Sequence, residues 1–132
     1  MLSRAFAHNN PMFYVVLFLL GGLIYVSLEF FWRGRSHVSV FFTSGLSCVL
    51  LYGVFSQFDT LLTLIKCLIG ALIITALEFI TGAIVNVALR LHVWDYSSHR
   101  YNLYGQVCLE YSALWMLLCA PITLLPAFVA SL

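Results

Sequence analysis

Charged side chains are scarce in this sequence of 132 residues, which has six Lys or Arg and five Asp or Glu, or 8% of the chain. A typical soluble domain has about 25% charged residues, because its surface has to face water. The mean hydropathy of +1.03 is also too high for a water-exposed surface. We therefore exclude a soluble globular protein and predict that the lipid bilayer is the partner and the solvent for most of the chain.

Several motifs that would indicate a cofactor or a catalytic centre are missing. The net charge is only +1, so nothing favours nucleic acid as a partner. The sequence lacks Cys-x-x-Cys, Gly-x-Ser-x-Gly, His-Glu-x-x-His and phosphate-loop motifs. The cysteines lie inside apolar runs, which favours free thiols packed as small apolar groups (Cys48, Cys67, Cys108 and Cys119). We expect no cofactor and no ATP hydrolysis by this chain alone, and a non-enzymatic role is favoured.

Four apolar runs are long enough to cross the hydrocarbon core, which takes about 20 helical residues. We predict an all-α integral membrane protein with a single transmembrane domain, residues 1–132, and with spans at about 12–31, 38–57, 61–91 and 105–130. The third run exceeds a core of roughly 30 Å, so it must tilt, kink or protrude. The fourth run contains Pro121 and Pro126, which favour a bend or an early end.

The first apolar run has a basic residue before it, as a signal peptide does. It is too long for the apolar core of a signal peptide, however, and Glu29 stands where a cleavage site would lie. We therefore interpret this run as a retained membrane helix.

Landmarks of the first half of the chain recur in the same order in the second half. The segment GGLIYVSLEF (21–30) shares Gly, Leu-Ile and Leu-Glu-Phe in register with GALIITALEF (70–79). Trp-x-x-x-Ser-His then follows at 32–37 and again at 94–99. We predict a parallel duplication of a two-helix unit, with halves at about 12–57 and 61–130 and a pseudo-twofold axis along the membrane normal. Chance similarity between apolar segments is the alternative.

The distribution of basic residues predicts the orientation in the membrane. The first and third connections lie on one side and carry four arginines (Arg33, Arg35, Arg90 and Arg100), against Arg4 and Lys66 on the other side. The positive-inside rule therefore predicts that loops 33–37 and 92–104 face the cytoplasm and that both termini face the outside. We expect the protein in the cytoplasmic (inner) membrane. Trp32 and Trp94 are suited to the headgroup level.

Three glutamates, Glu29, Glu78 and Glu110, lie in the predicted spans, where a buried charge costs about 2.5–3.5 kcal/mol. Gly82 and Asn86 follow Glu78 at the spacing of one helix face. Our first hypothesis is a transporter or channel in which Glu29, Glu78, Asn86 and Glu110 line a path for a small solute, ion or proton. The alternative is that these groups hold the helices together, for example through Glu-Arg pairs.

Polar residues also gather in and beside the two loops on the same side: Arg33, Arg35, His37, Trp94, Asp95, His99, Asn102 and Gln106. Our second hypothesis is a non-transporting subunit whose loops dock a partner protein or lipid headgroups. Less favoured are a metal or haem site shared by His37 and His99, and an interfacial lipid-active enzyme using His99 or His37 with Asp95. Because four helices enclose only a narrow site, we expect a homodimer.

The stretches WRGRSH (32–37), LEFITG (77–82), VWDYS (93–97) and NLYGQVCLEY (102–111) resemble those of small bacterial membrane proteins described as Putative ABC-transporter type IV, or CmpB-like. Small eukaryotic transmembrane proteins share similar Glu-Phe-x-x-Gly, Trp-Asp-Tyr-Ser and Leu-Glu-Tyr stretches. The resemblance covers residues 21–115 and implies a multi-span protein linked to transport. Any ATP hydrolysis would require a separate subunit. The residues that carry the match are Arg33, Gly34, His37, Glu78, Phe79, Gly82, Trp94, Asp95, Tyr96, Asn102, Gly105, Gln106 and Glu110.

Overall fold

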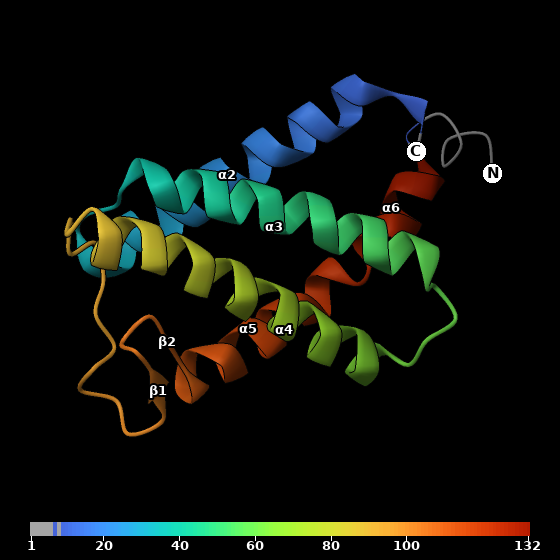
Figure 1. Cartoon of the computed structure of the whole chain (residues 1–132). Helices are drawn as coiled ribbons and strands as arrows, with labels where there is room; N and C mark the ends of the chain where they lie inside the picture. Colours follow the sequence, from blue (N-terminus) through green and yellow to red (C-terminus); the bar gives the residue numbers. More distant parts are fainter. Residues whose placement is uncertain (1–6, 8) are drawn as a thin grey trace.

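The computed structural model describes Ala7 and residues 9–132, so Arg4, used above to predict the orientation, lies outside the described residues. The described elements are α2 (Pro11–Arg33), α3 (Val38–Gln57), α4 (Thr63–Gly82), the π-helix η1 (Ala83–Ala88), β1 (Asn102–Leu103), β2 (Val107–Cys108), α5 (Leu109–Ile122) and α6 (Leu125–Ser131) (Figure 1). Helices dominate, and the strands form a single short hairpin within this described part.

Four helical segments in the described part are long and apolar enough to cross a membrane: Pro11–Arg33, Val38–Gln57, Thr63–Ala88 and Leu109–Ser131. Their outward-facing side chains are mostly apolar, and the Phe31 ring at the end of α2 is 96% exposed. Such a surface is stable against lipid and unstable against water. The predicted class, an all-α integral membrane protein with four spanning helices, is confirmed.

Capping residues set the limits of α2. The side-chain oxygen of Asn10 accepts the N–H of Met12 at 3.0 Å and caps the first turn. Gly34 ends the helix with a φ of 72°, and its N–H donates to the carbonyl of Phe30 at 2.8 Å. A side chain is strained at such a φ, so glycine suits this turn. Residues 34–37 then return the chain to α3.

The third span has 26 residues, about 39 Å of α-helix, which is longer than a hydrocarbon core of roughly 30 Å. The excess does not simply protrude as α-helix. Its last six residues form η1, in which the N–H of Leu89 donates to the carbonyl of Ile84 at 2.9 Å. This wider turn ends the span at Ala88, not at residue 91 as predicted from the apolar run.

The fourth span begins at Leu109, later than the predicted residue 105. The residues before it form a hairpin with Asn102 opposite Cys108 and Leu103 opposite Val107. Its three-residue turn contains Tyr104 and Gly105 at positive φ, which a helix cannot include. Farther along, the helix is interrupted at residues 123–124, between the two prolines.

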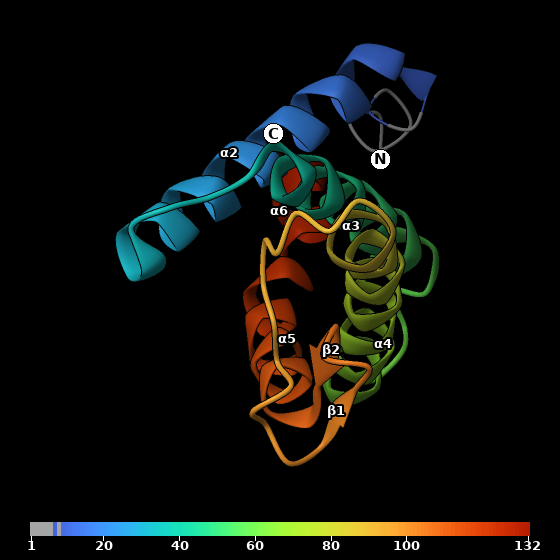
Figure 2. The same ribbon diagram turned by 60° about the vertical axis from the view of Figure 1, so that its left-hand side comes forward.

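Small residues allow α2 to approach α3 closely. A Cβ atom added to Gly45 would lie 2.7 Å from the carbonyl oxygen of Phe18, and one added to Gly21 would lie 2.5 Å from the Cβ of Cys48. Close approach of this kind is typical of helix pairs in membranes. In Figures 1 and 2, α2 is inclined to α3 and α4, which run side by side.

The two polar connections lie at one end of the bundle, whereas the α3–α4 connection and the end of α6 lie at the other (Figure 1). The duplication stays a prediction, and the two Trp-x-x-x-Ser-His copies differ in structure. Trp32 is 85% exposed, but Trp94 is 8% exposed and packs with Val40 and Val85. Trp94 therefore differs from the expected headgroup anchor, because it packs against α3 and η1.

Candidate functional site

A pocket of about 410 Å³ lies between the membrane-crossing segments. On α2 its wall extends from Leu17 to Arg33, roughly 24 Å at the rise of an α-helix. Most of the lining is apolar and comes from α2, α3, α5 and α6, including Leu17, Leu20, Ile24, Leu118, Ile122 and Leu125. The charged lining residues, Glu29, Arg33 and Glu78, lie at the end near the polar loops.

Glu78 is a buried carboxylate of this pocket and is 9% exposed. Tyr96, from the long loop, donates its hydroxyl to Glu78 Oε2 at 3.2 Å, and the indole of Trp115 on α5 donates to Oε1 at 3.4 Å. Among the described residues Glu78 has no ion-pair partner. The carboxylate is thus held by two neutral donors from different elements, one to each oxygen.

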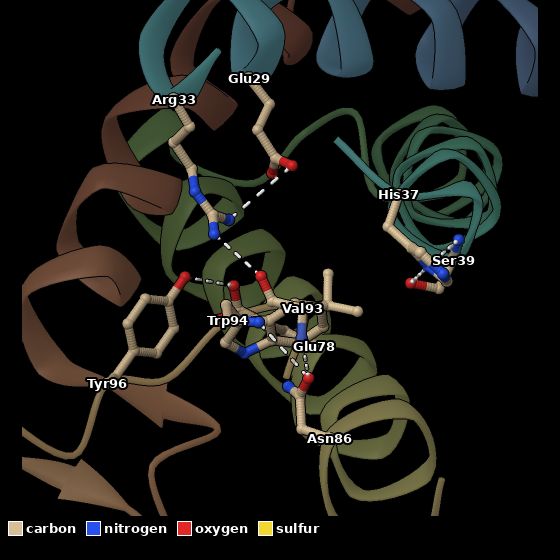
Figure 3. Close-up of polar contacts among 9 residues, drawn as sticks. All are labelled: Glu29, Arg33, His37, Ser39, Glu78, Asn86, Val93, Trp94 and Tyr96. Carbon is tan, nitrogen blue, oxygen red and sulfur yellow. Dashed lines mark hydrogen bonds and ion pairs between the residues drawn. The ribbon is translucent and has the colours of Figure 1, made fainter. Parts of the chain in front are cut away.

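Glu29 and Arg33 sit one helical turn apart on α2 and face the same pocket. Arg33 Nη1 lies 3.8 Å from Glu29 Oε1, too far for a hydrogen bond, and its Nη2 donates to the Val93 carbonyl at 2.8 Å. The Glu29 side chain is 9% exposed, and its Oε1 has no hydrogen-bond partner among the described residues. Figure 3 shows the guanidinium between the Glu29 carboxylate and the loop carbonyl.

Asn86, which the sequence placed on the same face as Glu78, holds the long loop in position. Its side-chain oxygen accepts the N–H groups of Val93 at 2.7 Å and Trp94 at 3.4 Å, and its amide donates to Gln106 Oε1 at 2.9 Å. The Trp94 indole in turn donates to the Gln106 carbonyl at 2.9 Å. These contacts place the Val93 carbonyl on Arg33 and bring the loop to Glu78 (Figure 3).

Gly82 leaves room for this network between Glu78 and Asn86. A Cβ atom at Gly82 would lie 2.5 Å from Gln106 Oε1 and 3.1 Å from Trp94 Cζ2. The predicted stripe of carboxylate, gap and amide is therefore present on one face, and that face contacts the loop and α5.

Aromatic rings surround the Glu78 carboxylate. Tyr25 and Trp115 have ring centroids 5.6 Å apart, and Tyr96 stacks on Tyr111 at 4.8 Å. Burial, and next the nearby Glu78 carboxylate, raise the pKa of Tyr96 above its ordinary value. The phenol of Tyr96 therefore remains a hydrogen-bond donor at neutral pH.

The other predicted site residues lie outside this pocket. His99 Nδ1 lies 2.6 Å from Glu110 Oε2, and this pair is partly exposed, with 62% exposure for Glu110. Asp95 is exposed and accepts the N–H of Ser97 at 2.9 Å, a contact that lowers its carboxyl pKa. His99 thus contacts Glu110, and no contact with Asp95 is found among the described residues.

Two further side chains shape the connections themselves. Asn102 donates to the His99 carbonyl at 2.7 Å and accepts the N–H of Gly105 at 2.9 Å, which stabilises the hairpin. His37 accepts the N–H of Ser39 at 3.1 Å and caps α3, and Arg35 is exposed (Figure 3 shows His37). Residues 7 and 9–132 contain no group of three metal-ligating side chains, and His37 and His99 serve separate contacts.

The family model described as Putative ABC-transporter type IV matches residues 12–130. The chain belongs to this family. The match confirms the resemblance and extends it over all four spanning segments. Searches of curated proteins and of solved structures found no match to the chain.

Membership in the Putative ABC-transporter type IV family places the chain among transporter-related membrane proteins. Of the residues that carried the resemblance, Arg33, Glu78, Trp94 and Tyr96 line the pocket. Gly82, Asn102, Gly105 and Gln106 instead shape the loop that brings Trp94 and Tyr96 to it.

Two aromatic members of the site, Tyr25 and Trp115, were not predicted from the sequence. Tyr25 precedes Glu29 by four residues and so shares its helix face, a signal that the spacing contained. Trp115 donates to Glu78 across 37 positions of the chain, and no local pattern predicts that contact.

Proposed function

We propose that this protein is a membrane transporter that moves a small solute, ion or proton, with Glu78 as the binding carboxylate of the pocket. The observation that carries the proposal is a buried carboxylate within a spanning helix that faces a pocket and has no ion-pair partner among the described residues. An uncompensated charge at such a site is unstable, so the group is protonated or takes a cation. Both states are suited to a path in which a proton or cation is bound and released.

The second carboxylate supports this assignment. Arg33 faces Glu29 at 3.8 Å and compensates at most one of the two pocket carboxylates. Glu110, the third predicted path residue, is paired with His99 outside the pocket, and Asn86 holds the loop. The proposed path therefore uses Glu78 and Glu29, with Asn86 as a positioning residue.

Proton movement into proteoliposomes tests this function. The vesicles contain a pH-sensitive dye, and a potassium gradient with a potassium ionophore sets the driving potential. We expect the protein to accelerate acidification and Glu78→Gln, which retains shape without charge, to abolish the acceleration. Glu110→Gln is the matched control and retains flux, because Glu110 lies outside the pocket. Wild-type flux equal to that of empty vesicles would contradict proton movement, and unaltered flux in Glu78→Gln would contradict the role of Glu78.

The assembly and location of the protein are part of the same proposal. We propose a homodimer in the cytoplasmic (inner) membrane, with loops 33–37 and 92–104 on the cytoplasmic side and a separate subunit for any ATP hydrolysis. The arginine-bearing connections lie at one end of the bundle, which supports this orientation. Native mass spectrometry in mild detergent tests the dimer, and labelling of a cysteine introduced at Arg35 in intact spheroplasts tests the side.

The hairpin favours a second candidate function, a non-transporting subunit that docks a partner protein. Tyr101, Leu103 and Tyr104 are 60%, 52% and 80% exposed around the hairpin, and Arg100 lies 5.3 Å from the centre of the Tyr101 ring. Exposed aromatic and arginine side chains are common in protein interfaces. This function predicts that charge reversal at Arg35 abolishes assembly with the partner and that Glu78→Gln leaves it intact.

A further inference from the structure

We propose that the ligand of the pocket is an amphipathic amine, with its ammonium head beside Glu78 and Glu29 and a single apolar chain along α2 and α5. This inference rests on the proposed function in that it names the substrate class for the same pocket. It goes beyond that function because it assigns the ligand an apolar part and a route of entry.

The charged end of the pocket matches an ammonium group. Two carboxylates and one guanidinium face it, and Oε1 of the nine-tenths buried Glu29 side chain has no hydrogen-bond partner among the described residues. An ammonium of the primary-amine type offers three donors and no acceptor, so it can satisfy Glu29 Oε1 and neutralise Glu78 together. An anionic head would meet two carboxylates and would be repelled.

Aromatic side chains strengthen this choice of head group. Tyr25, Trp94, Tyr96 and Trp115 all line the pocket together with Glu78. Faces of aromatic rings attract ammonium groups, more strongly where water is excluded. Sodium or potassium would gain less from such a wall, because these ions prefer oxygen ligands. The hydroxyls of Thr43, Ser44 and Ser47 also line the pocket, but each already donates to a backbone carbonyl of its own helix.

The rest of the pocket matches an apolar chain. Its leucine and isoleucine lining continues from the charged end to Leu17 on α2 and Leu125 on α6. The volume of about 410 Å³ lies in the lower part of the range for small-molecule sites, roughly 300–1,000 Å³. A single-chain molecule is suited to this space, whereas a two-chain lipid is not.

The pocket also opens towards the membrane. Leu20, Ile24 and Leu28 line it, yet they are 51%, 58% and 55% exposed on a helix whose outer surface faces lipid. A molecule dissolved in the hydrocarbon layer therefore reaches the site from the side, past α2. Amphipathic molecules concentrate at the boundary between headgroups and acyl chains, with the apolar chain in the hydrocarbon layer, which small hydrophilic cations do not enter.

The test is binding to the full chain in a non-ionic detergent, measured by native mass spectrometry and by tryptophan emission. The chain carries Trp32→Phe, so that emission comes from Trp94 and Trp115 at the pocket. The probes are dodecylamine, 1-dodecanol and butylamine, which separate the head from the chain. We expect one dodecylamine per chain, with dodecanol and butylamine each about tenfold or more weaker. Equal binding of dodecylamine and dodecanol would overturn the ammonium site, and equal binding of the two amines would overturn the chain site.

Two pairs of variants locate the bound molecule. Glu78→Gln should weaken dodecylamine about tenfold and leave dodecanol unchanged, whereas Glu110→Gln should change neither. Leu118→Phe fills the pocket and should weaken dodecylamine, whereas Leu117→Phe, at a position 71% exposed, should not. Dodecylamine affinity unaffected by both pocket variants would show that the amine binds elsewhere. The comparison of the three probes uses a chain with all pocket side chains intact. It therefore tests the ammonium site and the chain site even where a pocket variant does not fold.

Failure of this inference is distinguishable from failure of the transport function. Selective amine binding without Glu78-dependent proton flux would overturn proton transport through the pocket and support the ligand class. Glu78-dependent flux without amine selectivity would overturn the ligand class and support transport.

Discussion

Replacing Asn86 with alanine should detach the long loop from the end of the third span. The change removes two accepted hydrogen bonds, at 2.7 and 3.4 Å, and one donated bond at 2.9 Å. Each well-formed bond contributes about 1 kcal/mol net, and a buried partner left unsatisfied costs about 1–3 kcal/mol. Because the 3.4 Å contact is weak, we expect the free energy of unfolding to fall by about 2–4 kcal/mol.

The assay is reversible unfolding in mixed micelles with increasing dodecyl sulfate, followed by tryptophan emission. Val87→Ala is the matched control, since Val87 is the next residue, is 58% exposed and has no part in the network. We expect Val87→Ala to change the free energy of unfolding by about 0.5 kcal/mol or less. Limited trypsin digestion gives a second measurement, because Arg100 lies in the loop and is exposed.

Cleavage after Arg100 should accelerate in Asn86→Ala and stay at the wild-type rate in Val87→Ala. If Asn86→Ala unfolds at the same denaturant fraction as Val87→Ala and its loop is cleaved no faster, the loop is held by contacts other than those of Asn86. The positioning role assigned above would then be wrong. A double-mutant cycle with Gln106→Ala isolates the bond between the two amides, for which we expect a coupling of about 1 kcal/mol.

Two further predictions concern packing and acid stability. Gly45→Ala should destabilise the protein by about 1–3 kcal/mol, because the added Cβ meets the backbone of α2. Gly53→Ala is the control on the same helix, because a Cβ atom added there would have no neighbour within 4 Å. It should stabilise the protein by about 0.5–1 kcal/mol. Equal effects of the two substitutions on the free energy of unfolding in denaturant would contradict close helix approach at Gly45. The N–H of Ser97 lowers the pKa of Asp95 from its ordinary value of 3.8. The Asp95 carboxylate therefore stabilises the folded loop fully above pH 3.8. This stabilisation is lost as the pH falls through the lower pKa of the folded state. In the Trp32→Phe background, Asp95→Asn should therefore reduce the acid-induced change in emission below about pH 4, and superimposable acid profiles would show that the contact does not contribute.

Hydropathy predicted the four spans because a bilayer imposes length and apolarity on each helix independently. The second span is the clearest case, with both limits as predicted at Val38 and Gln57. The start of the fourth span was misplaced by four residues, since apolar residues of the hairpin continue the run without a break in composition. Asn102 and Gly105 carried the turn signal there. Gly105 has a positive φ, and its N–H donates to the side-chain oxygen of Asn102, which fixes the turn.

The site was partly predictable for the same reason. Glu78, Gly82 and Asn86 share a face by helical spacing alone, and the structure retains that face. What the face contacts depends on how the long loop folds, which involves partners up to 60 positions away, as in the bond from Arg33 to the Val93 carbonyl. Helical spacing therefore predicted that Glu78, Gly82 and Asn86 share one face. It could not predict that Asn86 binds the loop and that Glu78 lines the pocket.

The π-helix η1 has a consequence for chain length. A bond from Leu89 to Ile84 spans one residue more than an α-helical bond does, so this segment holds one residue in excess of the α-helical repeat. A one-residue deletion within Ala83–Ala88 can be absorbed by conversion to α-helix. The same deletion in α4 rotates the residues after it by about 100° relative to those before it, which separates Glu78 or Gly82 from the face that it shares. Alignments of this family should accordingly permit a single gap at this segment and none between residues 63 and 82.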